Sequence, residues 1–216
     1  DNNSLKLTGN NREAVYLGKN QVRDNLDWTV TFWIQIDSTI EGLNSFTGAG
    51  KIIEIFHIDW NIEGSGIFDG FFISTDAASL PSDATVGGLF IYDDVGITLS
   101  AWSYQALNDG VPHCVTVTYD SATGRRRIYV DGIDVTSGSY SNTAPTAILG
   151  AAKFAIRDSN QSIDIGYAAF IPYKLSPEQI QYLADLGNNT FVEKADNRFT
   201  RIMDTTNVPG TVENRH

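Results

Sequence analysis

The sequence predicts an all-β fold with one short helix near the C-terminus. Short runs rich in β-branched and aromatic residues recur along the chain, and Gly, Asn, Asp and Ser separate them, which is typical of a β-sandwich or a barrel. Most of these runs alternate apolar with polar residues, as strands with one packed face do. The expected strands are residues 14–17, 28–36, 51–58, 70–74, 88–92, 113–119, 126–130, 147–149 and 163–171.

The run 28–36 shows this alternation most clearly. Its even positions are apolar, whereas Thr29, Thr31 and Gln35 are polar, so one face is expected to pack and the other to be wet. Trp33 places an aromatic ring on the polar face. We expect this ring to fit beneath another segment rather than to offer a stacking surface to a ligand.

Two consecutive hairpins follow from glycine-containing turns at 123–124 and 131–132. Thr-Gly and Asp-Gly at these places supply the positive φ angles that tight turns need. The basic run 125–127 follows the first turn and leads into a strand. We therefore expect it to form a solvated sheet edge rather than a nucleic-acid site.

The helix is expected to begin at a capping box. Ser176 caps it and Gln179 completes the box, and the helix ends near Gly187. After this point the composition turns polar. Residues 1–187 are thus expected to form one sandwich domain, and 188–216 an extension packed on it or a linker to a following module.

Charge and hydropathy exclude two classes of partner. The formal net charge is −11, and an anionic surface repels the phosphate backbone, so no nucleic-acid partner is expected. No stretch approaches the roughly 18 consecutive apolar residues that cross a bilayer, so no membrane insertion is expected. The length of 216 residues still suits a single all-β unit.

Cys114 is the one cysteine, which excludes an intrachain disulfide. Its place in an alternating strand predicts a small buried hydrophobe. The neighbouring His113 points to the opposite face of that strand, so it cannot easily activate the thiol. With only His57 and His216 besides, a multi-histidine metal site is not expected.

Several segments carry a family resemblance. Residues 5–17, the strand 28–36, the stretch 113–132 and the end 165–180 are similar to laminin-G-like and pentraxin-like domains of the concanavalin A-like lectin/glucanase superfamily. The resemblance covers about residues 5–186 and implies a two-sheet antiparallel jelly-roll β-sandwich. It is specific for fold and poor for function, because each matching residue has a structural role. The chain departs from the pattern before His113, where many members have a Trp.

A catalytic carboxylate pair is not visible in the sequence. Glycoside hydrolases of this superfamily place carboxylates at even spacing on one strand, so that they face the same cleft. The nearest candidates, Glu54 and Asp59, have odd spacing and face opposite sides. No phosphate-binding glycine loop, HExxH helix or serine-centred elbow is present.

Asp93 and Asp94 are the strongest candidates for a metal site. Two adjacent carboxylates repel each other unless a cation neutralises them, and Ca²⁺ prefers carboxylate and carbonyl oxygens. Asp69 and Asp158 are further candidate ligands, although Asp at a strand end is also a common turn former. The resemblance implies calcium at the rim of the sandwich.

Two groups of loop aromatics are candidates for sugar binding, because aromatic faces stack on pyranose C–H groups while Asp and Asn bond the hydroxyls. The alternative for each group is an aromatic lid that closes one end of the core. The candidate ligand-binding residues are Trp60, Phe68, Trp102, Tyr104, Asn108 and Asp109.

Together these features favour a non-catalytic extracellular binding module of a larger secreted or cell-surface protein, such as an adhesin. The expected partner is a glycan or a cell-surface protein, with calcium as a possible cofactor and with neighbouring domains in the same chain. One alternative is a glycan-cleaving enzyme, a glycoside hydrolase or polysaccharide lyase, with carboxylates from separate strands. The other is a structural spacer or appendage module without a small ligand.

Overall fold

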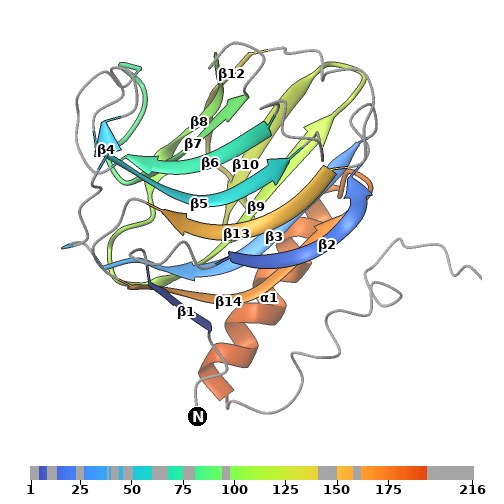
Figure 1. Ribbon diagram of the computed structural model, residues 1–216. Coiled ribbons are helices and arrows are strands. Elements are labelled where there is room, and N and C mark those ends of the chain that lie inside the picture. Colours follow the sequence, from blue (N-terminus) through green and yellow to red (C-terminus); the bar gives the residue numbers. More distant parts are fainter. Residues whose placement is uncertain are drawn as a thin grey trace, which may run out of the picture.

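The computed structural model is a β-sandwich of two antiparallel sheets with one helix outside it (Figure 1). The structure describes residues 5–8, 14–22, 27–37, 39, 44–45, 51–59, 68–74, 81–93, 98–140, 150–157 and 162–193. This architecture confirms the two-sheet all-β expectation.

In the part of the chain that the structure describes, the smaller sheet has six strands. In spatial order they are β1 (Leu5–Thr8), β14 (Ser162–Ile171), β3 (Trp28–Gln35), β9 (Pro112–Asp120), β10 (Arg125–Val130) and β11 (Ile133–Asp134). The two predicted hairpin turns join β9 to β10 and β10 to β11. Gly124, Asp131 and Gly132 adopt φ angles of 67°, 52° and 85°, which confirms the positive φ that the sequence requires there.

The larger sheet has eight strands among the described residues. In spatial order they are β12 (Thr136–Ser139), β8 (Thr98–Ala106), β7 (Gly88–Asp93), β6 (Phe68–Ser74), β5 (Lys51–Asp59), β13 (Gly150–Arg157) and β2 (Ala14–Val22), and β4 (Asn44–Ser45) pairs with β5. The strands β4, β8, β12 and β13 were not predicted, and the expected strand 147–149 lies outside the described residues. The pairing of β7 with β8 shifts register between Ile91 and Tyr92 of β7, which are paired with Ala101 and Leu99 of β8. This shift interrupts the alternation of inward and outward side chains along β8.

The core lies between the sheets and is built from alternate residues of their strands. Phe32 of β3 stacks on Phe56 of β5, which stacks on Phe71 of β6 with ring centroids 5.0 Å apart. At one end Trp28 stacks on Tyr119 at 5.5 Å. These rings are fully buried, so their apolar area drives the sheets together.

Arg126 corrects the prediction for the basic run 125–127. Arg125 and Arg127 are exposed, but Arg126 is 2% exposed, and its guanidinium lies over the Tyr119 ring, 5.1 Å from the centroid. Strand alternation explains the burial, because Arg126 shares the inner face of β10 with Ile128. The run is therefore only partly a solvated edge.

Helix α1 (Pro177–Glu193) covers the outer face of the smaller sheet. Its capping box is confirmed, since the Ser176 N–H donates to Gln179 Oε1 at 2.9 Å and the Gln179 N–H donates to Ser176 Oγ at 3.3 Å. The helix continues past the predicted end near Gly187. The described part of the chain has no helix long and apolar enough to span a membrane.

Trp33 packs beneath this helix, which confirms that its ring is not a ligand surface. It is 3% exposed, and a Cβ on Gly187 would lie 2.1 Å from its indole, so only glycine fits there. The helix and its lead-in also bury Thr29 and Thr31, for which a wet face was predicted. The Thr29 hydroxyl donates to Tyr173 O at 2.9 Å, so burial leaves it bonded.

We expect Trp33→Ala to lower the free energy of unfolding by about 3 kcal/mol, because it empties a buried ring site between β3 and α1. Chemical denaturation of the whole chain measures this. Tyr182→Ala on the exposed side of the same helix is the control and should stay within about 0.5 kcal/mol of the parent protein. Equal losses in the two variants would contradict the packing described here.

Candidate functional site

The outer face of the larger sheet carries an aromatic cluster. Its members are Phe72, Phe90 and Trp102, with Ala84, Tyr92 and Leu99 packed against them. Ile91 follows Phe90 in β7, and Ala101 precedes Trp102 in β8. Both Ile91 and Ala101 belong to the core between the sheets. Because strand neighbours point to opposite faces, the cluster lies on the outer face.

Residues 81–87 cover this cluster, and Asp83 fixes them there. The Trp102 indole N–H donates to Asp83 Oδ1 at 3.0 Å, and the Ser137 hydroxyl is 2.9 Å from Asp83 Oδ2 and 2.8 Å from Asp83 O. The carboxylate itself stays exposed. The hydrogen bond from Ser137 lowers the pKa of Asp83. Partial desolvation opposes this shift and the hydrogen bond from Trp102 adds to it, so the carboxyl group is anionic at neutral pH.

Two exposed tyrosines lie near Trp102, whose indole donates to this carboxylate. Tyr140 is 57% exposed, and its ring centroid is 5.4 Å from that of Trp102. Tyr104 is 51% exposed and lies two residues beyond Trp102 on the same face of β8. The Tyr140 N–H donates to Ser100 O, whereas the Tyr104 N–H donates to Val135 O, which places them toward opposite ends of the β8–β12 pair.

We call Asp83, Tyr104, Ser137 and Tyr140 the outer-face site. Tyr104 is held in place by its hydroxyl, which donates to Asp134 O at 3.2 Å. Trp102 is the base of the site, and it fits because a Cβ at Gly138 would lie 2.0 Å from its ring. The arrangement offers two half-exposed aromatic rings and a fixed anionic acceptor.

Sequence analysis predicted only part of this site. Trp102 and Tyr104 were predicted to lie on a loop, which is wrong, since both lie in β8. Trp102 is only 6% exposed, so it supports the site without offering a ring face. Tyr140 and Asp83 were missed because only the pairing of β12 with β8, and the return of residues 81–87 over the sheet, bring them to Trp102.

The other predicted aromatics and loop residues lie elsewhere. Trp60 lies outside the described residues, and of Phe68 the structure describes only the backbone, at the start of β6. Asn108 lies in the β8–β9 loop, where its side chain occupies the space next to Gly87. Asp109 is in the same loop and contacts His113.

The structure describes the backbone of two of the four predicted calcium ligands, Asp69 and Asp93. Asp94 and Asp158 lie outside the described residues. The register pairs Asp69 of β6 with Asp93 of β7, so these two backbones are neighbours. Among the residues that the structure describes, no group of three or more His, Cys, Asp or Glu could hold a metal ion. The calcium site stays a prediction.

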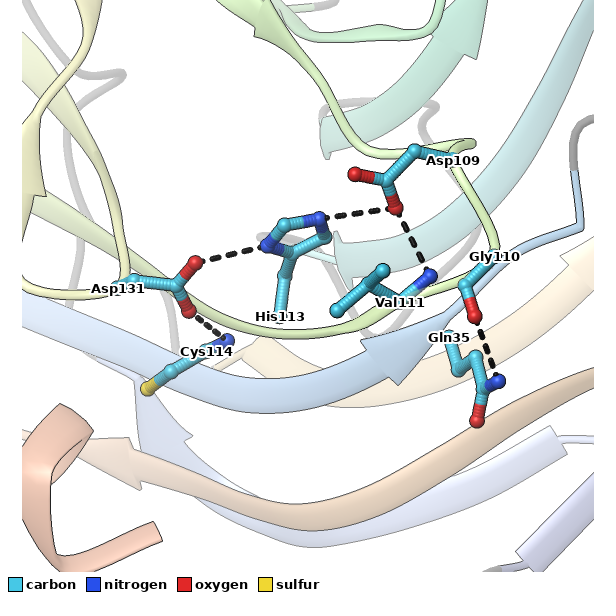
Figure 2. Close-up of polar contacts among 7 residues, drawn as sticks. All are labelled: Gln35, Asp109, Gly110, Val111, His113, Cys114 and Asp131. Atoms are coloured by element: carbon cyan, nitrogen blue, oxygen red, sulfur yellow. Dashed lines mark hydrogen bonds and ion pairs between the residues drawn. The ribbon is translucent and has the colours of Figure 1, made fainter. Parts of the chain in front are cut away.

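His113 lies buried between two aspartates (Figure 2). Its Nδ1 is 2.8 Å from Asp131 Oδ2, and its Nε2 is 3.2 Å from Asp109 Oδ1. The carboxylates are held in turn by backbone donors. The Cys114 N–H donates to Asp131 Oδ1 and the Val111 N–H donates to Asp109 Oδ1, both at 2.9 Å. The cluster thereby ties the β8–β9 loop to the β10–β11 turn.

The two carboxylates favour the charged imidazole. The hydrogen bond to Asp131 is the largest cause and, with Asp109, outweighs burial, so the pKa of His113 is raised above its usual value near 6.5. Burial opposes ionisation of Asp109, but the Val111 N–H and the charge of His113 prevail and lower its pKa below the usual 3.8.

This cluster lacks a nucleophile among the described residues that contact it. Burial raises the pKa of the Cys114 thiol to about 12, and the thiol packs against Trp33 and Ala184 beneath the helix. His113 does not contact it, which confirms the prediction that the two side chains lie on opposite faces (Figure 2). The arrangement holds charge and orders a loop rather than activating an attacking group.

No model of a known protein family matches this chain, and no curated protein matches it in sequence. Among solved structures it is similar to domain 4 of AbnA, a GH43 extracellular arabinanase from Geobacillus stearothermophilus, in complex with arabinotriose. The TM-score is 0.57 and the identity 13%, over 84% of this chain and 76% of that one.

It is also similar to the binding domain of Paraclostridial Mosquitocidal Protein 1. Here the TM-score is 0.53 and the identity 14%, over 87% of this chain but only 44% of that one. This chain therefore spans less than half the length of that domain. Likeness at such low identity shows a shared β-sandwich fold.

We expect Asp131→Ala to lower the free energy of unfolding at pH 6 by about 2 kcal/mol, because it removes the main partner of His113 and leaves the Cys114 N–H unpaired. A raised histidine pKa stabilises the fold fully below about pH 6.5, and this contribution is lost as pH rises through the raised value. The difference between the parent protein and the variant should therefore shrink from pH 6 to pH 9.

Denaturation at several pH values measures this difference. Asp185→Ala, on the exposed side of α1, is the control and should change stability by less than about 0.5 kcal/mol. A difference for Asp131→Ala that stays constant across the pH range would contradict the charged His113.

Proposed function

We propose that this chain is a non-catalytic glycan-binding module whose ligand lies on the outer-face site. The observation that carries the proposal is the exposed Asp83 carboxylate, which Trp102 and Ser137 fix in place. The half-exposed Tyr140 ring lies against the same indole, and Tyr104 lies two residues further along β8. Aromatic faces pack on sugar C–H groups, and a carboxylate accepts hydrogen bonds from sugar hydroxyls. These are the two chemistries that a neutral oligosaccharide requires.

Preorganisation supports this role. The Asp83 carboxylate has two donors that hold it in place, and the Tyr104 hydroxyl is bonded to the backbone of Asp134. Groups that are already ordered lose little conformational freedom when a ligand binds, so more of the contact energy remains as affinity. Fixed groups at the surface of the molecule also suit an extended chain of sugars better than a deep pocket would.

The position of the helix also supports the outer face of the larger sheet. Helix α1 covers the corresponding face of the smaller sheet by packing on Trp33, Tyr129 and Ile171. That face is therefore occupied. The site on the larger sheet instead presents two half-exposed tyrosine rings, and tyrosine is enriched at binding interfaces because it combines an apolar ring with a polar hydroxyl.

Two structures with the same fold agree with a binding role. Domain 4 of the extracellular arabinanase was solved with arabinotriose, and the second similar structure is named a binding domain of a mosquitocidal protein. The laminin-G-like resemblance of the sequence points the same way. We propose that this chain is one module of a larger secreted or cell-surface protein and that it belongs to the concanavalin A-like group.

Glycan binding is tested first with an array of neutral oligosaccharides that includes arabinotriose, and then by calorimetry on the hits. Tyr140→Ala and Tyr104→Ala should each weaken binding by about threefold to tenfold, since an aromatic contact contributes about 0.5–1.5 kcal/mol. Tyr182→Ala, which removes an exposed ring on α1, is the matched control and should bind normally.

Two outcomes would overturn this proposal. Absence of binding to every glycan, with and without calcium, would favour a structural spacer. Shorter sugars released from a polysaccharide panel would instead identify a glycan-cleaving enzyme.

Calcium at the rim of the sandwich is a second part of the proposal. Asp93 and Asp94 lie at and just after the end of β7, and the register brings Asp69 opposite Asp93. Oxygen ligands from adjoining strand ends suit Ca²⁺, whose charge would relieve the repulsion between these carboxylates. Such an ion would brace the rim where β6 begins and β7 ends.

Thermal unfolding in calcium against excess EDTA tests this site. Calcium at a hundredfold its dissociation constant should stabilise the fold by about 2.7 kcal/mol, because only the folded chain assembles the ligands. The double variant Asp93→Asn, Asp94→Asn should lose the rise in Tm, whereas Asp185→Asn on α1 should keep it. An equal Tm of the parent protein in calcium and in EDTA would contradict the proposed calcium site.

A further inference from the structure

The His113 cluster can exist in its observed form only with a charged imidazole. Both ring nitrogens of His113 lie within hydrogen-bond distance of a carboxylate oxygen, one on Asp131 and one on Asp109. A neutral imidazole has a single N–H, so it can donate to one of them only, while its other nitrogen presents a lone pair to an anion. Loss of the proton must therefore break one of the two contacts.

The contact to Asp109 is the weaker of the two. It measures 3.2 Å against 2.8 Å for Asp131, and the Asp109 side chain is 50% exposed against 32% for Asp131. Asp131 is also held by the N–H of Cys114. A neutral His113 would therefore keep its proton on Nδ1 for Asp131, and its Nε2 lone pair would repel Asp109.

Asp109 holds the loop 107–111 in place. Gly110 joins this loop to the end of β3. Its N–H donates to Ile36 O, and its carbonyl accepts from Gln35 Nε2 at 2.8 Å (Figure 2). On the other side of the loop, the Leu107 N–H donates to Gly87 O at 2.8 Å. A release of Asp109 would free one anchor of this loop.

Gly87 connects the loop to the outer-face site. It ends the segment 81–87, which carries Asp83 and covers Trp102, and the Asn108 side chain fills the space beside Gly87. The Thr85 hydroxyl in the same segment donates to Tyr104 O at 2.7 Å. Direct contacts thus run from His113 through the loop 107–111 to the groups of the site.

We propose that His113 and Asp109 form a pH-operated latch, which is closed while His113 is charged and then holds the loop 107–111 against the segment 81–87. A rise in pH removes the proton, releases Asp109 and loosens the support of the outer-face site. The consequence for glycan binding rests on the proposed function, whereas the release of the loop does not.

The groups around His113 support this assignment. Asp131 and Asp109 face it directly, and the residue opposite on β3 is the apolar Ile34. The α1 side chain beside Gly132 of the β10–β11 turn is the neutral Gln181, which is bonded to Asp185. Since the carboxylates raise the pKa of His113 above 6.5, the latch is closed below about pH 6.5 and opens as pH rises through the raised value.

Amide hydrogen exchange of the whole chain at several pH values tests the latch. After correction for the intrinsic pH dependence of exchange, the loop 107–111 should lose protection by roughly tenfold from pH 6 to pH 9, since a hydrogen bond to a charged group contributes roughly 1.4 kcal/mol or more. The amides in the middle of β3 are the internal control and should not change.

Asp109→Asn separates the latch from a general pH effect. The same Asp109 oxygen, Oδ1, contacts both the Val111 N–H and His113 Nε2. A neutral amide oxygen in its place still accepts from the Val111 N–H and responds much less than a carboxylate to the charge of His113, so the protection of the loop should differ little between the two pH values. An unchanged loop in the parent protein would overturn the latch. So would a pH-dependent step that persists in Asp109→Asn.

Calorimetry with arabinotriose gives the functional readout. The parent protein should bind it several-fold more weakly at pH 9 than at pH 6, and Asp109→Asn should bind it equally at both. A pH-dependent step in exchange without any arabinotriose binding would support the latch and count against the glycan proposal. Equal affinity of the parent protein at the two pH values would overturn the link between the latch and the site.

Discussion

The packing of two sheets through their inner faces is the constraint on which the rest of the structure depends. Strand alternation sends every second residue into the shared core, so the residues between them must be covered or solvated. On the smaller sheet, α1 covers Trp33 and Cys114. On the larger sheet, the segment 81–87 covers Trp102, and Asp83 is fixed over the indole by this cover. The candidate site thus arises from the need to bury an outer-face aromatic.

Local chemistry explains why much of the fold could be predicted from sequence. The Asp-Gly turn at 131–132, the Ser176 capping box and the alternation of β3 each depend on residues close together in the chain. Arg126 shows the limit. Its charge predicts exposure, but its place in the alternation of β10 puts it on the inner face, and the Tyr119 ring receives it there.

The candidate site was harder to predict because it depends on pairing between distant segments. Tyr104 could be proposed from residue type alone, but its place on a strand could not, since the shift in register hides the alternation of β8. Tyr140 stands in a stretch rich in Ser and Gly that has no aromatic pattern. The contacts of His113 likewise join a loop and a turn that only the β9–β10 pairing brings together.

The most direct test of the glycan account is NMR of the indole N–H groups during titration with arabinotriose. The chain has four tryptophans, so each indole signal can be assigned by single substitution. Because the Trp102 N–H donates to Asp83 at the centre of the proposed site, its signal should move with sugar concentration, whereas those of Trp28 and Trp33 should not. Movement of the Trp60 signal with a stationary Trp102 would contradict the account and place the ligand elsewhere.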